Sequence, residues 1–529
     1  MQPWFSVSTL AVVAGNCIQR RMRRDKAAVT ASIRSEVEMA WDVVVIGCGV
    51  AGLSAAVTAA EGGAKVALLE RAPYDERGGN SRYTEAWMRM KTEDEVADDL
   101  IDLFLERGHG AIGPEFLKEV SNDYENWPQN VRAYPFNDPE IVGSLAENAP
   151  GTMAWLKEHG VKFTFHSPML LQKGPERMGP SGGGLAIVEA LATSAEKLGV
   201  EIMYQTTGRS LLLDDAGNIR GVRCWSKEKG NFAIETPNVV IASGGYQGNL
   251  EMMTRYVGHN AHLTRPVSPG GVFNKGEGIE MMLAVGAAPA GQYDMFHGEP
   301  VDPRSPKHEA LIAVVNYGIL VNVHGKRFMD EGSNRYELIY DDVSWTIMRQ
   351  KLGIAHLLFD SRMFDIPNIR TRIKTDQEPI RASSIAEMAS KIGVPERVLI
   401  ETVRNYNAAT VEGDYDTTRL DDLHTQGLAL PKSNWARPID ESDLYAYPIM
   451  CANTFTCGGV KITKDAQVVN RDGEPIPGLY ASGETVGLYY NLYVGATSVL
   501  RGLVFGRQAG RKICETLGAK GKTTPSIAA

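Results

Sequence analysis

Closely paired cysteines are missing from this sequence of 529 residues. No two cysteines have C-x-x-C spacing, which argues against a zinc knuckle or an iron–sulfur cluster held by the chain itself. Scattered thiols are typical of a reducing compartment, so we expect a cytoplasmic protein. The six cysteines are Cys17, Cys48, Cys224, Cys451, Cys457 and Cys514.

Long apolar runs and a basic surface are also missing. No apolar run reaches the roughly 18 residues that span a bilayer, so we expect no direct membrane span. The net charge of −9, without a basic cluster in the main body, argues against nucleic-acid binding. The histidines have no ligand spacing, so no metal site is expected. A chain this long predicts two packed domains rather than one simple core.

The first 38 residues differ from the rest of the chain. An apolar run, Leu10 to Gly15, precedes an arginine cluster at 20–24, which is the reverse of the order in a secretory signal. An Arg-rich targeting peptide is one interpretation. We favour the other, in which Met39 is the functional start and residues 1–38 are an extension. Residues 521–529 are interpreted as a tail.

A glycine-rich turn follows the first strong strand pattern. Residues 41–46 predict a buried parallel strand, residues 47–52 read Gly-Cys-Gly-Val-Ala-Gly, and residues 53–61 predict a helix. A second strand over 65–69 ends on Glu70. Strand, G-x-G-x-x-G turn, helix, strand and acid together indicate a dinucleotide-binding βαβ unit.

Each of these residue types has a physical role in binding a dinucleotide. Gly47 permits the tight turn, Gly49 lets the backbone approach a pyrophosphate, and Gly52 lets the helix pack on the strand. The helix N-terminus stabilises phosphate charge. Glu70 can accept hydrogen bonds from a ribose, and an acid there disfavours the 2′-phosphate of NADP.

Distant segments favour FAD as the dinucleotide. The small, polar loop at 78–81 can pass beneath a flavin, a strand over 238–242 leads into a glycine turn at 243–249, and a late strand at 478–484 ends on Glu484. Residues 495–498 open a helix whose N-terminus can face the flavin. No second G-x-G-x-x-G is present for a nicotinamide, so electrons are expected to pass through a separate partner. The predicted FAD-binding residues are Gly47, Gly49, Val50, Ala51, Gly52, Glu70, Arg71, Gly79, Asn80, Ser81, Ala242, Gly244, Gly483, Glu484, Ser498 and Val499.

The middle of the chain is interpreted as an inserted cap. Residues 312–330 predict paired strands around a turn at 324–325, and residues 335–440 alternate helical stretches with proline-bearing loops. The predicted fold class is α/β: a Rossmann-like FAD-binding domain of the glutathione-reductase type with an inserted α+β capping domain. We place the FAD-binding domain at 39–291 and 453–520, and the cap at 292–452.

Over residues 42 to about 515, the chain resembles the flavoproteins of the fumarate reductase and succinate dehydrogenase family. The matching motifs are the 47–52 loop with Glu70, Gly78-Gly-Asn-Ser81, Ser243-Gly-Gly245, Asn274-Lys-Gly-Glu-Gly278, Ile319-Leu-Val-Asn322 with Gly325-Lys-Arg-Phe328, Cys457-Gly-Gly-Val460 and Ala481-Ser-Gly-Glu484. Residues 330–332, 481–487 and 489–495 look most like tricarballylate dehydrogenases. That subclass oxidises tricarballylate to cis-aconitate and passes electrons to a membrane iron–sulfur/haem partner.

The resemblance implies roles for three residues. His297 matches the histidine that contacts a substrate carboxylate, and Arg335 matches the arginine that moves a proton while flavin N5 exchanges the hydride. Because arginine is a poor base, an electrostatic clamp is the rival role for Arg335. Tyr493 replaces a second substrate-binding arginine of the family and is our third catalytic candidate.

Other positions also depart from the family. A histidine appears here as Phe455, and a Thr-Glu pair appears as Ala310 and Leu311, so clamping of a C4 dicarboxylate at both ends is not expected. The loop over 77–83 lacks the histidine that attaches flavin covalently, so we expect non-covalent FAD.

Three functions follow from these features. The first is an FAD-dependent dehydrogenase or reductase acting on a C–C bond of a small carboxylic acid, which retention of His297 and Arg335 favours. The second is an enone or 3-ketosteroid-type dehydrogenase, in which Tyr493 and Tyr317 or Tyr336 polarise a carbonyl. The third is a non-catalytic flavin subunit.

Overall fold

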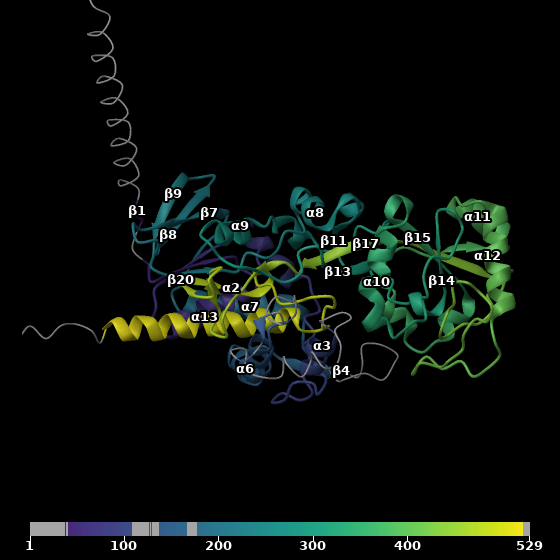
Figure 1. Cartoon of the computed structure of the whole chain (residues 1–529), viewed down its shortest axis with the longest axis horizontal. Coiled ribbons are helices and arrows are strands. Elements are labelled where there is room, and N and C mark those ends of the chain that lie inside the picture. The colour runs from purple at the N-terminus through teal and green to yellow at the C-terminus, as the bar shows by residue number, and fades with distance from the viewer. Residues whose placement is uncertain are drawn as a thin grey trace, which may run out of the picture.

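The structure is a computed structural model that describes residues 37–38, 41–107, 126, 128, 129, 137–166 and 177–521. Most of the predicted extension and nearly all of the predicted tail lie outside these residues. The molecule is elongated, and the N-terminal and C-terminal parts of the chain share one end (Figure 1). The middle of the chain, coloured green, forms the other end.

A six-stranded sheet forms the centre of the first end, in the order β19-β20-β10-β2-β3-β6. Its strands are parallel except β19, which pairs antiparallel with β20. Strands β2 and β3 are buried at every residue, as expected for a parallel sheet covered on both faces. The strands are β2 (Val43–Ile46), β3 (Val66–Leu69), β6 (Glu201–Met203), β10 (Val239–Ile241), β19 (Gln467–Val469) and β20 (Pro475–Ala481).

Three helices pack together beside this sheet: α2 (Val50–Glu61), α7 (Gly183–Lys197) and α13 (Ser498–Gly521). Helix α13 runs along α2 as the long yellow helix in Figure 1. Helix α2 begins at Val50, three residues before the predicted Leu53, because the chain turns directly from Gly49 into the helix. The other helices before the cap are α3 (Leu100–Arg107), α6 (Pro139–Glu158), α8 (Leu250–Val257) and α9 (Glu277–Ala284), of which α8 packs against cap residues such as Phe296 and Met348.

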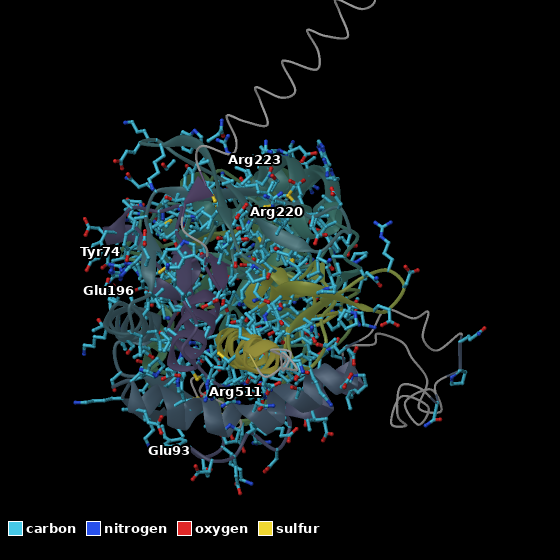
Figure 2. All side chains as sticks on the ribbon, turned by 90° about the vertical axis from the view of Figure 1, so that its left-hand side faces the viewer. Tyr74, Glu93, Glu196, Arg220, Arg223 and Arg511 are labelled. Atoms are coloured by element: carbon cyan, nitrogen blue, oxygen red, sulfur yellow. The ribbon has the colours of Figure 1, made fainter. Side chains whose placement is uncertain are left out.

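Smaller sheets flank the six-stranded sheet of the first end. A four-stranded sheet has the order β1-β9-β8-β7 and lies at the outer edge of the molecule. Figure 2 views this end and shows labelled basic side chains, such as Arg220 and Arg511, on the same face as the acidic Glu93 and Glu196. The strands of the four-stranded sheet are β1 (Val37–Glu38), β7 (Thr206–Leu213), β8 (Ile219–Ser226) and β9 (Gly230–Glu235). Two further sheets have two strands each: β4 (Phe163–His166) pairs with β5 (Arg177–Pro180), and β12 (Pro289–Ala290) pairs with β18 (Gly459–Val460).

The second end is built on a mixed sheet in the order β11-β17-β15-β14, with β13 and β16 also paired to β17. A hydrophobic cluster separate from the main core lies between this sheet and helices α11 and α12, and includes Ile319, Leu399 and Val403. The elements are β11 (Arg265–Pro266), β13 (Phe296–Val301), β14 (Ile319–Asn322), β15 (Ile354–Asp360), β16 (Ile380–Ala382), β17 (Leu444–Thr456), α10 (Tyr336–Met348), α11 (Ile385–Ile392) and α12 (Glu396–Ala409).

Two sequence predictions for the cap are wrong. Residues 326–331 do not form the second strand of a hairpin; β14 pairs instead with β15, and only a single bridge joins Val321 to Arg327. The reason is a side-chain network, because the Glu331 carboxylate binds Arg327 and accepts a hydrogen bond from the backbone N–H of Leu320 at 2.7 Å. The helix-and-loop pattern predicted for 335–440 also missed strands β15 and β16.

Candidate functional site: two joined cavities

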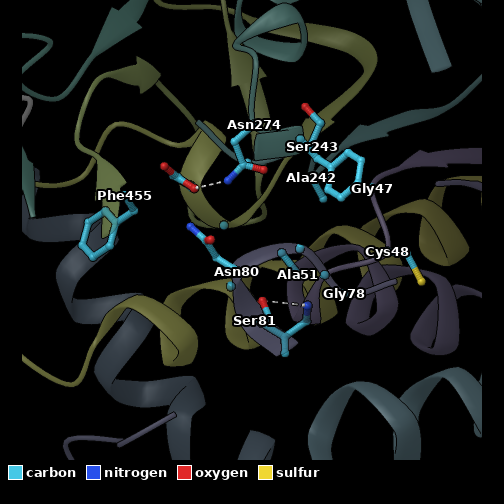
Figure 3. Close-up of a pocket in the computed structure, with 18 of the residues that line it drawn as sticks. Gly47, Cys48, Ala51, Gly78, Asn80, Ser81, Ala242, Ser243, Asn274 and Phe455 are labelled. Carbon is cyan, nitrogen blue, oxygen red and sulfur yellow. Dashed lines mark hydrogen bonds between the residues drawn. The ribbon is translucent and has the colours of Figure 1, made fainter. Parts of the chain in front are cut away.

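The glycine-rich turn is packed so closely that side chains cannot be added to it. A Cβ atom on Gly47, whose φ is +110°, would lie 2.4 Å from the Ala242 carbonyl oxygen. A Cβ atom on Gly52 would lie 1.8 Å from the Gly47 carbonyl oxygen. The turn therefore brings β2, α2 and the end of β10 together beneath an open space (Figure 3).

That space is a cavity that is partly open to solvent; its empty volume, open solvent included, is about 1260 Å³. Of the residues predicted to bind FAD, Gly52 does not line it, because it packs behind Gly47. Phe455 lies on the side of the cavity opposite Gly47 and Cys48 (Figure 3). The predicted residues that line it are Gly47, Gly49, Val50, Ala51, Glu70, Arg71, Gly79, Asn80, Ser81, Ala242, Gly244, Gly483, Glu484, Ser498 and Val499.

Glu70 is fixed at the tip of β3 by the backbone. One carboxylate oxygen accepts a hydrogen bond from the Cys48 N–H at 2.9 Å, and the other accepts one from the Ala72 N–H at 2.7 Å. Burial raises the pKa of Glu70, while these two donors oppose the rise. Each oxygen keeps a second lone pair, so the carboxylate can still accept hydrogen bonds from a ribose.

Glu484 is held at another part of the same cavity. Its carboxylate accepts from the Thr456 N–H at 2.8 Å and from the Asn274 amide at 3.3 Å, an interaction drawn as a dashed line in Figure 3. Gly245 makes room for it, because a Cβ atom there would lie 2.2 Å from a Glu484 oxygen. Burial raises the pKa of Glu484.

Arg501 on α13 is a cavity residue that the sequence interpretation missed. Its guanidinium lies 4.5 Å from the Tyr489 ring centre and donates to the Val486 carbonyl at 3.1 Å. Its Nε atom is buried without a hydrogen-bond partner among the described residues. A buried cation beside the cavity favours a ligand with negative charge or carbonyl oxygens at this point.

A second cavity, with an empty volume of about 1260 Å³ including open solvent, adjoins the first. It lies between the first end of the molecule and the cap, and all three predicted catalytic residues, His297, Arg335 and Tyr493, line it. The structure thus brings together residues that are far apart in the sequence. The residues that line both cavities are Thr84, Val267, Glu309, Thr454, Ser498 and Val499.

His297 is held between two carboxylates. Its Nδ1 lies 2.9 Å from Asp341 and its Nε2 lies 3.3 Å from Glu299. Burial lowers the pKa of His297, but Asp341 and Glu299 outweigh burial and raise it to about 10. The imidazole is therefore positively charged at neutral pH. A substrate carboxylate would have to replace Glu299 to reach Nε2.

Tyr493 packs against this histidine. The two ring centres are 4.5 Å apart, and the Tyr493 hydroxyl donates to the Ser498 hydroxyl at 3.1 Å. Of the two tyrosines considered as partners for Tyr493, Tyr336 lines the second cavity, whereas Tyr317 packs on Trp435 away from it.

The second cavity contains further charged residues that sequence reasoning did not single out. Arg177 pairs with Glu337 and donates to the Gly495 carbonyl at 2.9 Å, and burial lowers its pKa to about 10. Lys374 pairs with Glu85 at 2.5 Å. The Nε atom of Arg372 is buried with no hydrogen-bond partner in the described part of the chain.

The model of the FAD binding domain family matches residues 42–499. The chain belongs to this family. FAD is its cofactor, and the first cavity fits it, with a glycine turn that a Cβ would block, a buried carboxylate at the tip of β3 and buried polar atoms that have no partner among the described residues. The predicted α/β fold with an FAD-binding domain and a cap is confirmed.

The chain is similar in sequence and in structure to known oxidoreductases. It is 28% identical over 501 residues to "Fumarate reductase (cytochrome)" of Shewanella frigidimarina, covering 93% of this chain and 80% of the relative. It is 27% identical over 544 residues to "4-oxocyclohexanecarboxylate 2-dehydrogenase" of Sinomonas cyclohexanicum, covering 89% and 92%. The open conformation of a flavocytochrome c3 fumarate reductase superposes with a TM-score of 0.70 at 22% identity, covering 93% of this chain and 81% of that one.

These relatives confirm an FAD-dependent oxidoreductase that acts on CH–CH groups, and membership of the fumarate reductase and succinate dehydrogenase flavoprotein family. The narrower assignment to tricarballylate dehydrogenases stays a prediction, as does the cytoplasmic location. Within the residues that the structure describes, no helix is long and apolar enough to cross a membrane.

Proposed function

We propose that this flavoprotein oxidises or reduces a C–C bond of a small polycarboxylic acid of the tricarballylate type. The observation that carries the proposal is the pair Arg335 and Arg372 in the second cavity, where Arg372 Nε is buried without a partner among the described residues. A buried guanidinium donor is stabilised by a carboxylate that completes its hydrogen bonds. The cavity shares six lining residues with the FAD site, so a bound acid would lie next to the flavin.

We expect Arg372 to supply hydrogen-bond donors and positive charge that a histidine and a second arginine supply in fumarate reductases and that this chain lacks. The resemblance sets Phe455 and Tyr493 at positions where fumarate reductases carry a histidine and an arginine. Phe455 lines the first cavity and Tyr493 the second, and the ring of each packs against His297. Arg372 belongs to the cap and approaches the cavity from a different segment. A different arrangement of cations is expected to select a different acid from fumarate or succinate.

FAD, when bound, supplies the exchange of a hydride with the substrate carbon. The protein's own contribution is to bind and orient the acid, exclude water and handle the proton. We propose that Arg335 holds or moves that proton, that His297 provides fixed positive charge, and that Tyr493 positions the substrate and the N-terminus of α13 through Ser498. FAD is proposed to be held without a covalent bond.

Electrons are proposed to enter or leave through a separate protein, such as a membrane-bound iron–sulfur or haem partner. The support is the lack of a second G-x-G-x-x-G sequence for a nicotinamide. The name of one relative, "Fumarate reductase (cytochrome)", includes a cytochrome.

Anaerobic flavin bleaching tests the substrate class. The yellow holoenzyme is titrated with tricarballylate, succinate and a 3-ketosteroid while the long-wavelength flavin absorbance is followed. Bleaching by a polycarboxylate is expected, and Arg372→Met should weaken its binding about 10- to 100-fold because one charged hydrogen-bond donor is lost. Reoxidation of pre-reduced enzyme by cis-aconitate would assign the reductive direction.

One observation favours a second candidate, an enone or ketosteroid-type dehydrogenase. Tyr336 and Tyr493 both line the second cavity, and a pair of phenols can polarise a carbonyl. The relative named 4-oxocyclohexanecarboxylate 2-dehydrogenase has both an oxo group and a carboxylate in the name of its substrate. Bleaching by the ketosteroid alone would select this candidate and reject the polycarboxylate proposal.

A further inference from the structure

A wholly buried lysine lies behind the turn that leads to Arg335. Lys432 has no exposed surface, although lysine is among the residue types least often buried. Its Nζ donates a hydrogen bond to the Asn316 backbone carbonyl at 2.6 Å. Neither Lys432 nor Asn316 lines either of the joined cavities, so contact with substrate or FAD does not account for this charge. An uncharged side chain of the same length would avoid the cost of removing an ammonium from water, so the lysine needs another role.

Asn316 connects the lysine to the turn. It lies in the short helix η6 (Val315–Tyr317) and is buried. Both donors of its side-chain amide are used, one to the Glu331 carbonyl at 2.9 Å and one to the Asn334 carbonyl at 3.0 Å. The Asn334 side-chain oxygen in turn accepts from the backbone N–H of Arg335 at 2.9 Å. Hydrogen bonds therefore run without a break from the ammonium to the residue at which α10 begins.

The two residues that follow Lys432 hold the same turn. The backbone N–H of Ser433 donates to the Asp330 carboxylate at 3.0 Å, and its hydroxyl donates to the same carboxylate at 2.5 Å. The Asn434 side-chain amide donates to the Gly332 carbonyl at 2.9 Å. A Cβ atom on Gly332 would lie 2.4 Å from the Asn434 carbonyl oxygen, so the two segments are in direct contact. Three consecutive residues thus bind the turn that carries Arg335 into the second cavity.

We infer that Lys432 is a positioning residue, whose ammonium fixes Asn316 and thereby the backbone from which Arg335 reaches the second cavity. The inference rests on the proposed function, in which Arg335 handles the substrate proton. A guanidinium at the end of a long side chain is placed only as accurately as the backbone that carries it. Because a small displacement from the productive geometry costs rate more than affinity, loss of this contact should slow flavin reduction and leave acid binding nearly unchanged.

The charges around Lys432 make this contact sensitive to pH. Burial lowers the pKa of Lys432 to about 8; Glu331, Asp330 and Asp421 oppose the fall, and Arg327 adds to it. As the pH rises through about 8, the ammonium therefore gives way to a neutral amine, which is a weaker hydrogen-bond donor. The turn should be held most firmly below that pH.

Hydrogen–deuterium exchange of the holoenzyme tests the contact without any substrate. At pH 7, Lys432→Met should speed exchange about 10-fold in peptides covering residues 331–338, where the N–H groups of Arg335 and Leu338 are hydrogen-bonded. Lys351→Met, at an exposed lysine of the cap, should leave these peptides as in the wild type. Wild-type exchange in Lys432→Met would overturn the inference.

A double-mutant cycle tests whether the effect passes through Arg335. With whichever acid bleaches the wild type, Lys432→Met should slow flavin reduction about 10- to 100-fold with little change in the acid's Kd. In an Arg335→Ala background the same substitution should change the rate by less than about 3-fold, because the group that it positions is absent. Equal slowing in both backgrounds would indicate general structural damage and would overturn the positioning role.

Asn316→Leu keeps the test decisive where Lys432→Met does not fold. It removes the two side-chain donors to the turn and leaves the lysine in place, so it should reproduce both the faster local exchange and the slower flavin reduction. Unchanged exchange and rate in Asn316→Leu would overturn the inference as directly as in the lysine variant.

The pH dependence of the wild type gives a third measurement. The rate of flavin reduction should fall as the pH rises through about 8, and Lys432→Met should lack this step. A step that persists in Lys432→Met would assign the titration to another group and overturn the role of the ammonium. If no acid bleaches or reoxidises the wild type, the proposed substrate class fails, while the exchange result still reports on Lys432.

Discussion

At the scale of single residues, Arg335 gives the most direct test of the proposed chemistry. It lies at the start of α10 and lines the second cavity, apart from the FAD cavity. Arg335→Ala should lower the rate of flavin reduction by about 10²- to 10⁴-fold and leave the flavin spectrum and FAD content nearly unchanged.

Stopped-flow absorbance with the bleaching acid checks this prediction. Arg349→Ala, at the exposed C-terminal end of the same helix, is the matched control and should react like the wild type. Arg335→Lys separates charge from geometry, because a lysine retains the charge but not the planar fork. Substantial activity in Arg335→Ala would remove this residue from the catalytic role.

Asp341 is expected to set the charge of His297. The imidazole pKa, about 10 in the folded protein, is far above the ordinary value of about 6.5. Its contribution to stability is therefore complete below about pH 6.5 and is lost as the pH rises toward 10. Asp341→Asn removes the main opposing charge, so His297 should lose its proton at a lower pH.

We expect acid binding by Asp341→Asn to weaken between pH 6 and 9, where the wild type stays nearly constant. Flavin difference spectra recorded during titration with tricarballylate measure this dependence. Asp342→Asn is the adjacent, exposed control and should keep the wild-type profile. Identical profiles for both variants would mean that Asp341 does not govern the charge of His297.

Residues in local motifs were predictable, and residues placed by tertiary packing were not. Gly47 and Glu70 belong to one short unit whose spacing fixes their positions, and the structure places both in the FAD cavity. Arg501, Arg372 and Glu309 approach the cavities from three distant segments. No short-range pattern marks a lone charged residue as buried, so the sequence contained no usable signal for them.

At the scale of elements, the contact between α2 and α13 positions the cofactor cavity. A Cβ atom on Gly506 would lie 2.4 Å from the Ala51 carbonyl oxygen, so Gly506→Val should push α13 away from α2. Because Ser498 and Val499 at the start of α13 line the FAD cavity, the variant should lose FAD and be destabilised by about 1–3 kcal/mol.

Gly518 provides the matched control on the same helix. It is exposed, and a Cβ atom there would meet nothing within 4 Å. Gly518→Ala should keep the FAD content and stabilise the protein by about 0.5–1 kcal/mol, since alanine favours the helix. Flavin absorbance after gel filtration and thermal unfolding measure both effects. Equal FAD content in the two variants would contradict the packing argument.

The strands, like the residues, divide into those that a local sequence pattern predicts and those that depend on tertiary contacts. The strands β2, β3, β10 and β20 were predictable because each is a short apolar run that ends in a glycine or acidic turn. The hairpin over 312–330 was wrong because alternation alone does not reveal that Glu331 satisfies the Leu320 N–H in place of a strand partner. The strand pairing of the cap depends on such long-range contacts.

At the scale of the whole molecule, bound FAD is expected to stabilise the folded protein by contacting segments that are far apart in the sequence. Its cavity is lined by segments from residue 46 to residue 502, which meet only in the folded state. Saturating FAD, at about 100 times its Kd, should stabilise the protein by about 2.7 kcal/mol. Thermal unfolding of the apoprotein with increasing FAD should therefore show a rising midpoint.

Glu70→Ala tests the contribution of the Glu70 carboxylate to this effect. The variant loses the carboxylate that is predicted to accept hydrogen bonds from the ribose, and it leaves the N–H groups of Cys48 and Ala72 unpaired, so more FAD should be needed for the same rise. Glu76→Gln alters a nearby exposed carboxylate and should behave as the wild type. A fully loaded Glu70→Ala protein would remove Glu70 from the cofactor role.

Strand β17 has a practical consequence for protein engineering. It runs without interruption from Leu444, paired with β15 and β16, to Thr456, whose N–H holds Glu484 in the FAD cavity. Exchanging caps between relatives to obtain a new specificity would require a chimera junction beyond Thr456. A chimera junction at residue 453 would build β17 from two half-strands that come from different proteins, directly beside the FAD cavity.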